Sequence, residues 1–367
     1  MKVPMLDLNA QYSPILDDIR AEIEKVFVTH AYKLGPQVKE FEEDIKEFCK
    51  VKHAIGCASG TDALLLALLA LNIYEGDEVI TTPFTFFATA GTIHRVGATP
   101  VFVDVKPDTF NIDPQKIEPA ITSKTKAIIP VHLFGQPAEM DKIMDIARKY
   151  DLKVIEDNAQ GIGAAFDDKF TGTIGDIGTL SFFPSKNLGA MGDGGMCLTN
   201  NDELAAKLFQ LRVHGENPQY YHKWVGLNSR LDTIQAAVLL VKLRSLQSWS
   251  EARRQNAEYY YKHLNSIPQV TLPVIHKNAT SIFNQFTLLA EQRDGLLKHL
   301  RAHDIGCAVY YPRALHLQEC FAYLNYKEGD FPVSEDLSKK VISIPVFSEI
   351  TREQQDFVIQ SIRKFYR

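Results

Sequence analysis

The sequence predicts an α/β protein in which helices cover both faces of a mostly parallel sheet. Apolar strand-like runs recur between residues 54 and 200, and helical segments separate several of them. Strands that alternate with helices favour parallel pairing. Runs that are apolar throughout are typical of strands buried on both faces. The runs are AIGCAS (54–59), DEVITT (77–82), PVFVDV (100–105), KAIIPVHLF (126–134), KVIEDNA (153–159) and GTLSFF (178–183).

The helical pattern divides the chain into a large and a small part. Charged helices are expected within residues 12–50, and one or two long helices from 232 to about 262. After residue 268, short strand-like pieces mix with helices, which predicts a smaller α+β domain. We expect domains at 1–246 and 247–367. The C-terminal pieces are QVTLP (269–273), NQFTLLA (284–290), RDGLLKHLRAHD (293–304), GCAVYY (306–311) and REQQDFVIQSIRKFY (352–366).

Composition narrows the class of protein. The chain has 367 residues, 45% of them hydrophobic, and a formal net charge of -5 with scattered basic residues, so nucleic acid is not an expected partner. The longest apolar run, residues 63–71, is far shorter than the roughly 20 residues that cross a membrane. The five cysteines are scattered and form no C-x-x-C pair. We therefore expect a cytoplasmic protein.

Gly60 and Thr61 follow a strand-like run and open a helix, where a phosphate can bind. Backbone N–H groups at a helix N-terminus lack partners, and the helix dipole adds partial positive charge. Simple capping of the helix by a serine or threonine is the alternative explanation. This motif therefore needs support from elsewhere in the chain.

Glu156 and Asp157 close an apolar strand and so fall at the carboxyl edge of the predicted sheet. Open α/β sheets bind ligands at this edge. Adjacent strand residues point to opposite faces, so at most one of these carboxylates serves a given site. The alternative explanation for Glu156 and Asp157 involves no function: they could be a solvated acidic pair or a cap for the next turn.

Lys186 stands between an aromatic run and a glycine run in SFFPSKNLGAMGDGG (181–195). A lysine amine can form a Schiff base with a carbonyl, and pyridoxal 5'-phosphate (PLP) is the commonest carbonyl cofactor held this way. Such a site needs the lysine, an acidic partner for the ring nitrogen and donors for the phosphate. Lys186, Asp157 and the set Gly60, Thr61 and Ser181 supply all three, so the combination predicts a PLP site.

Other functional motifs are broken or missing. GIGAAF (161–166) begins like a dinucleotide fingerprint, but Phe166 stands where Gly or Ala is needed. The sequence contains no P-loop, no H-E-x-x-H and no G-x-S-x-G. These observations argue against an oxidoreductase with a nucleotide cofactor, and the isolated histidines predict no metal site.

Several segments resemble the DegT/DnrJ/EryC1/StrS family of sugar-nucleotide aminotransferases, in the same order along the chain. The resemblance runs from about Val3 to the C-terminus, and it implies the PLP-dependent aspartate-aminotransferase-like fold (type I) with a mostly parallel seven-stranded sheet. Residues 214–243 are most similar to the branch that aminates 3-oxo sugars. The segments are SGTDAL (59–64), PFTFFATA (83–90), VHLFGQ (131–136), IEDNAQGIGA (155–164), SFFPSKNLGAMGDGG (181–195) and VGLNSRLDTIQAA (225–237).

The resemblance implies an enzyme that moves an amino group from L-glutamate to a nucleotide-linked 3-oxo sugar. The acceptor would be of the UDP-2-acetamido-3-oxo-uronate or dTDP-3-oxo-6-deoxyhexose type, in bacterial lipopolysaccharide or amino-sugar biosynthesis. A 4-oxo acceptor is the alternative within the family, and a catalytically silent regulator that binds PLP or a sugar is the alternative outside it. Related 3-dehydrases carry histidine where Lys186 stands, so lysine favours transamination.

The same resemblance implies roles for single residues. Lys186 would be the catalytic lysine, and Asn228 would reach the phosphate from the neighbouring subunit, which predicts a homodimer with shared active sites. The other cofactor contacts would be Gly60, Thr61 and Ser181 on the phosphate, Phe86 on the ring face, Asp157 on the ring nitrogen and Gln160 on the ring hydroxyl. The substrate would meet Arg230, Tyr310 and Tyr311.

Two positions depart from the family pattern. Asn158 replaces the first alanine of EDAAQ and places an extra amide next to Asp157. Tyr310 replaces the histidine of His-Tyr-Pro, which leaves the sugar open. Neither departure touches Lys186.

Overall fold

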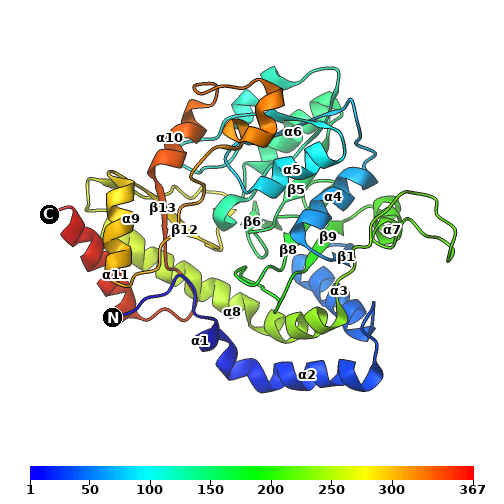
Figure 1. The fold of residues 1–367 in the computed structure, drawn as a ribbon, viewed down its shortest axis with the longest axis horizontal. Helices are drawn as coiled ribbons and strands as arrows, with labels where there is room; N and C mark the ends of the chain where they lie inside the picture. Colours follow the sequence, from blue (N-terminus) through cyan, green and yellow to red (C-terminus); the bar gives the residue numbers. More distant parts are fainter.

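The computed structural model describes residues 1–367. Helices pack on both faces of a central sheet, and the C-terminal elements lie to one side of it (Figure 1). The helices are α1 (Leu8–Tyr12), α2 (Leu16–Thr29), α3 (Pro36–Cys49), α4 (Gly60–Ala70), α5 (Phe87–Arg95), α6 (Met140–Tyr150), α7 (Asp202–Leu211), α8 (Thr233–Leu264), α9 (Arg293–Ala302), α10 (Pro332–Lys340) and α11 (Arg352–Phe365).

The central sheet has seven strands in the order β1-β9-β8-β5-β4-β2-β3. The predicted mostly parallel sheet is confirmed, because only β9 runs against its neighbours. The glycine-rich segment between β8 and β9 forms no helix, so the chain returns directly as an antiparallel strand. The strands are β1 (His53–Cys57), β2 (Glu78–Thr81), β3 (Thr99–Phe102), β4 (Thr125–Ile128), β5 (Lys153–Asp157), β8 (Ile177–Ser181) and β9 (Gly195–Thr199).

The helix α8 joins the two ends of the molecule. Its first half packs with α3 and the sheet through Ala236 and Leu239, and its second half enters the C-terminal core through Ala257 and Tyr260. Apolar residues on successive turns of both halves explain why it forms one 32-residue helix. The boundary expected at residues 246 and 247 falls inside this helix, and the division into two domains stays a prediction.

The C-terminal elements form a second, smaller sheet in the order β10-β12-β13. The strand expected at GCAVYY (306–311) is wrong, because only Ala308 bridges to Ser343 there. Residues 305 and 306 instead pair with the N-terminal Val3. The remaining strands are β6 (Ala165–Phe166), β7 (Lys169–Phe170), β10 (Val270–Thr271), β11 (Ala279–Thr280), β12 (Phe286–Ala290) and β13 (Val341–Ile344).

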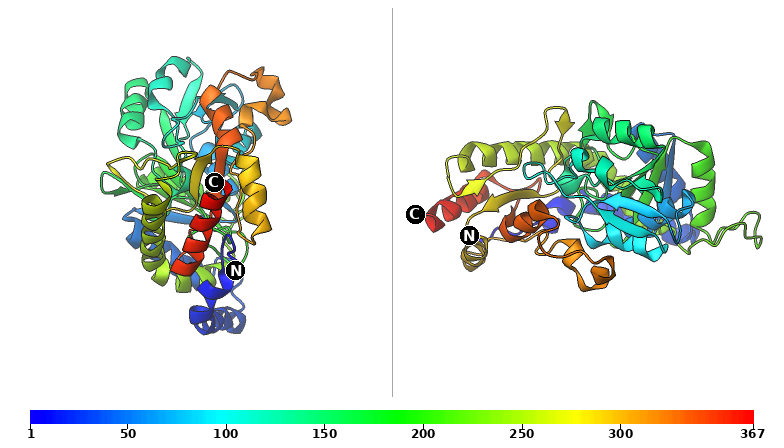
Figure 2. Two further views of the ribbon diagram at one scale, coloured as in Figure 1. Left: turned by 90° about the vertical axis from the view of Figure 1, so that its left-hand side faces the viewer. Right: turned by 90° about the horizontal axis from the view of Figure 1, so that it is seen from above.

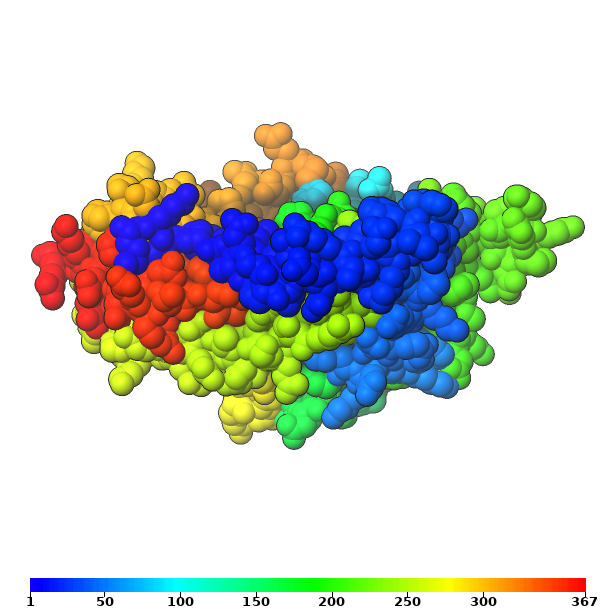
Figure 3. All heavy atoms as spheres, turned by 90° about the horizontal axis from the view of Figure 1, so that it is seen from below, coloured from blue at the N-terminus to red at the C-terminus, as the bar shows by residue number.

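The segment after residue 310 folds back onto the central sheet. Phe321 and Phe331 pack against Phe102 of β3. Asp104 accepts hydrogen bonds from Ser334 N (2.9 Å) and Val333 N (3.0 Å) and so caps α10. The N-terminal segment runs across one face of the molecule (Figure 3), and the loop after α7 extends away from the body (Figures 1 and 2).

Candidate active site

The predicted site residues meet at the carboxyl edge of the sheet. β5 ends at Asp157, β8 ends at Ser181, and α4 begins at Gly60 just after β1. These three strands run in the same direction, so their ends share one edge. A Cβ added to Gly60 would lie 2.6 Å from Ser181 Cβ, which explains why glycine is required there.

The start of α4 forms an anion cradle beside Ser181. Ser59 caps the helix, because its Oγ accepts a hydrogen bond from Asp62 N at 3.1 Å. The N–H groups of Gly60 and Thr61 have no acceptor in the chain and belong to the first helical turn. Gly60, Thr61 and Ser181 thus lie side by side at the start of α4, and the cradle that they form fits a phosphate.

The Asp157 carboxylate is buried at the end of β5 and held by two donors. Thr89 Oγ1 donates to Oδ2 at 2.7 Å, and Ala159 N donates to Oδ1 at 3.3 Å. Burial raises the pKa of Asp157 above its usual value, while the Thr89 bond and the nearby Lys186 oppose this rise. Asp157 is therefore placed to bind a cation in a desolvated pocket.

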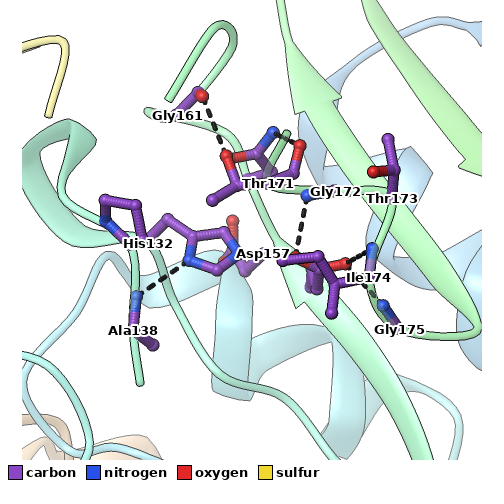
Figure 4. Close-up of polar contacts among 12 residues, drawn as sticks. His132, Ala138, Asp157, Gly161, Thr171, Gly172, Thr173, Ile174 and Gly175 are labelled. Carbon is purple, nitrogen blue, oxygen red and sulfur yellow. Dashed lines mark hydrogen bonds and ion pairs between the residues drawn. The ribbon is translucent and has the colours of Figure 1, made fainter. Parts of the chain in front are cut away.

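Glu156 turns to the other face of β5, as expected for adjacent strand residues. Its carboxylate accepts from Gly172 N at 2.8 Å and from Gly175 N at 2.7 Å (Figure 4). His132 Nε2 lies 2.8 Å from the same carboxylate, and Ala138 N donates to His132 Nδ1 at 3.1 Å. The proton of the neutral ring is therefore on Nε2, and Glu156 anchors the loop instead of serving the site.

Lys186 lies in the turn after β8 with its amine near Asp157. Its backbone N–H donates to Phe183 O at 2.9 Å, which closes the turn. Burial of the amine lowers the pKa of Lys186 to about 8, and the charge of Asp157 opposes this. A low pKa leaves more of the amine neutral, the form that attacks a carbonyl.

Gln160, Phe86 and Tyr311 border the space around Asp157. Gln160 Oε1 accepts from Phe134 N at 2.6 Å, so its amide nitrogen is left to donate. Tyr311 Oη lies 3.4 Å from that nitrogen, and the Tyr311 ring centroid lies 6.3 Å from that of Phe86. Phe86 is 57% exposed, so its ring face is open to a ligand.

Asn228 and Arg230 line a hollow beside the start of α4. They line a cavity of about 630 Å³ with Ser59 and Asp193, and Arg230 donates to Asn228 Oδ1. Neither side chain contacts Lys186 or Asp157 within the chain. Tyr310 is partly buried beside Tyr311, with ring centroids 5.8 Å apart.

The unusual Asn158 does not touch Asp157 through its side chain. Its amide donates to Thr171 O at 2.8 Å and accepts from Thr171 Oγ1 at 2.8 Å. The same Thr171 Oγ1 lies 3.0 Å from Gly161 O (Figure 4). Through these hydrogen bonds, Asn158 holds the segment 161–173 against the end of β5.

The sequence analysis missed Thr89 and His132 as neighbours of Asp157. Thr89 lies inside the family motif PFTFFATA, but only the fold places it against β5. The residues present fit PLP, because a desolvated lysine and a buried carboxylate lie near each other at the sheet edge that also carries the anion cradle. No group of three or more His, Cys, Asp or Glu side chains suits a metal ion. No helix is both long and apolar enough to cross a membrane.

The fold and this site define a PLP-dependent aminotransferase of fold type I. The chain belongs to the DegT/DnrJ/EryC1/StrS aminotransferase family, whose model matches residues 14–363. The family model and the solved structures confirm both the expected fold and the expected family, and PLP is the cofactor of this family.

Three relatives cover nearly the whole chain. A "Pleiotropic regulatory protein" of Geobacillus stearothermophilus is 50% identical over 100% of this chain and 99% of its own. A "UDP-N-acetyl-3-dehydro-alpha-D-glucosamine 3-aminotranferase" of Acidithiobacillus ferrooxidans is 45% identical over 99% of this chain and 97% of its own. The crystal structure of S. venezuelae DesV in complex with a ketimine intermediate superposes with a TM-score of 0.98 at 38% identity, over 100% and 99% of the two chains.

Proposed function

We propose that this enzyme transfers the amino group of L-glutamate to carbon 3 of a nucleotide-linked 3-oxo sugar. The observation that carries this proposal is the desolvated Lys186 amine beside the buried Asp157 carboxylate, next to an anion cradle. The Acidithiobacillus relative, which is named for a 3-dehydro sugar, supports the choice of acceptor. The product would be a 3-amino sugar nucleotide for a surface glycan such as lipopolysaccharide.

The family resemblance and the positions of the residues at the sheet edge support the proposed roles. PLP, when bound, supplies an electron sink for the carbanion formed at the donor Cα. Asp157 keeps the ring nitrogen protonated, because an opposite charge favours the charged form. Lys186 would act as the base that takes the donor Cα proton and as the acid that returns it. The remaining contacts would be Gly60, Thr61 and Ser181 on the phosphate, Phe86 on the ring face and the Gln160 amide on the ring hydroxyl.

A regulatory role is the second candidate function, and it is suggested by the name of the Geobacillus relative. The complete pair of Lys186 and Asp157 supports catalysis instead, since it supplies both a base for proton transfer and a partner for the ring nitrogen. Substrate contacts by Arg230, Tyr310 and Tyr311 remain part of this proposal.

We also propose a homodimer in the cytoplasm. The loop after α7 carries Tyr220, Tyr221 and Val225, which are 81%, 71% and 93% exposed. Exposed apolar side chains of this kind mark interaction surfaces. All five cysteines are free thiols, which supports a reducing compartment.

The test uses the purified PLP-loaded enzyme. We expect L-glutamate alone to bleach the visible absorbance of bound PLP, and a 3-oxo sugar nucleotide to restore it. A panel of UDP- and dTDP-linked 3-oxo and 4-oxo sugars identifies the acceptor. Lys186→Ala is the matched control and is expected to show neither change. Restoration by 4-oxo sugars alone would overturn the assigned acceptor, and an unresponsive wild-type spectrum would favour the regulatory role.

A further inference from the structure

Two threonine hydroxyls form a chain that ends on the Asp157 carboxylate. Thr85 Oγ1 lies 3.2 Å from Thr89 Oγ1, and Thr89 Oγ1 lies 2.7 Å from Asp157 Oδ2. All three side chains are buried. An ionised carboxylate only accepts hydrogen bonds, so Thr89 donates to Asp157 and accepts from Thr85. The direction of the chain is therefore fixed whenever Asp157 is charged.

We propose that Thr89, supported by Thr85, is a positioning residue that orients Asp157 toward the ring nitrogen of PLP. This inference rests on the proposed role of Asp157. A carboxylate has room for about four donors. Thr89 occupies Oδ2, while Oδ1 receives only the long contact from Ala159 N at 3.3 Å. The Thr89 bond thus fixes the rotation of the carboxylate and leaves Oδ1 open to the cofactor.

The other groups around Asp157 do not replace this bond. The charged and titratable side chains that face it are Lys186, His132 and Tyr311. His132 donates its N–H hydrogen bond to Glu156, and the hydroxyl of Tyr311 lies next to Gln160, while the Lys186 amine makes no hydrogen bond. Thr89 therefore supplies the one side-chain hydrogen bond that Asp157 receives.

Thr89→Val tests the inference, because valine keeps the shape and removes the hydroxyl. We expect PLP to bind about tenfold more weakly, which corresponds to about 1.4 kcal/mol. Thr89→Ser keeps a hydroxyl and is expected to restore most of the affinity. Thr92→Val is the matched control, since Thr92 is buried on the same helix but donates only to Ala88 O and Thr89 O.

A pH titration of the bound PLP absorbance separates positioning from a merely structural effect. When the Asp157 contact is weaker, the ring nitrogen of PLP is protonated less often. The ring then carries less positive charge and repels the proton on the Lys186 nitrogen less. The pH midpoint of the absorbance change therefore rises. Thr85→Val is expected to raise the midpoint by a smaller amount, and Thr92→Val to leave it in place.

Wild-type affinity together with a wild-type midpoint in Thr89→Val would overturn the inference. If Thr89→Val fails to fold by circular dichroism, an unmoved midpoint in Thr85→Val overturns it. Neither measurement uses an amino donor or a sugar. A failure here is therefore distinct from a failure of the proposed transamination.

Discussion

The amine of Lys186 sets the pH at which the apo-enzyme can capture its cofactor. Only the neutral amine attacks a carbonyl, and burial lowers the pKa of Lys186 from 10.5 to about 8. At pH 7 about a tenth of the sites would hold a neutral amine, against about one in a few thousand for an ordinary lysine. The low pKa thus makes Lys186 reactive near neutral pH.

We predict that the rate of PLP capture rises with pH and levels off above about pH 8. Stopped-flow absorbance of apo-enzyme mixed with PLP measures it. In Asp157→Asn the midpoint is expected to fall further, because the carboxylate charge raises the lysine pKa. A rate that climbs steadily to pH 10 would show an ordinary, solvated amine.

Single residues of the site were partly predictable from the sequence. Lys186, Asp157 and Gly60 each lie where a strand meets a turn or a helix, and such positions can be found by pattern. Thr89 and His132 could not be found this way. Their partners Asp157 and Glu156 are 68 and 24 residues away in the chain, and only the fold brings them together.

Among the elements, α10 is capped by a buried carboxylate, Asp104, that follows β3 of the central sheet. Asp104 is 3% exposed and accepts from Val333 N, Ser334 N and Ser334 Oγ, the last at 2.6 Å. A carboxylate at a helix N-terminus satisfies free N–H groups and complements the helix dipole. This contact holds the segment that follows Tyr311 against the sheet.

We predict that Asp104→Ala lowers the free energy of unfolding by about 2–4 kcal/mol, since several buried donors lose their acceptor. Urea denaturation measures the loss. The matched control is Asp113→Ala, whose side chain caps a short turn through Gln115 N alone and should cost about 1 kcal/mol. Equal losses in the two variants would mean that α10 is held by apolar packing alone.

The sequence predicted long elements better than short ones. Strong apolar periodicity predicted α8 and the buried strands of the parallel sheet. The strand β9 follows a glycine run, so its first residue cannot be located from the sequence pattern. The helix α5 contains ATAGTIHR, in which one glycine and three threonine or histidine residues have low helix propensity. α5 forms because its Ala88 and Ile93 pack into the core over the sheet. Tertiary packing thus decides where local propensity does not.

For the whole molecule, Asn228 links the candidate site to the proposed dimer. Asn228 bridges to Val213, just after α7, and within its own chain it lines a hollow with Ala58 and Ser59. Those residues directly precede the anion cradle at Gly60. Mixed dimers distinguish a contact of Asn228 with the cradle of its own chain from a contact across the dimer.

We predict that Asn228 acts across the dimer, so that Lys186→Ala and Asn228→Ala complement each other. A mixed dimer, isolated by two affinity tags, would hold one site with both defects and one with neither. Its activity should be about half that of the wild type, because dimers of this symmetry have two equivalent sites. A dimer of wild type with Lys186→Ala is the control and should give the same half.

The opposite result has an equally definite meaning. If Asn228 serves its own chain, every site of the mixed dimer carries one defect, and its activity falls to half that of the Asn228→Ala homodimer. The loop after α7 would then have to bring Asn228 to the cradle of its own subunit. The exposed Tyr220 and Tyr221 would in that case contact the partner without completing its active site.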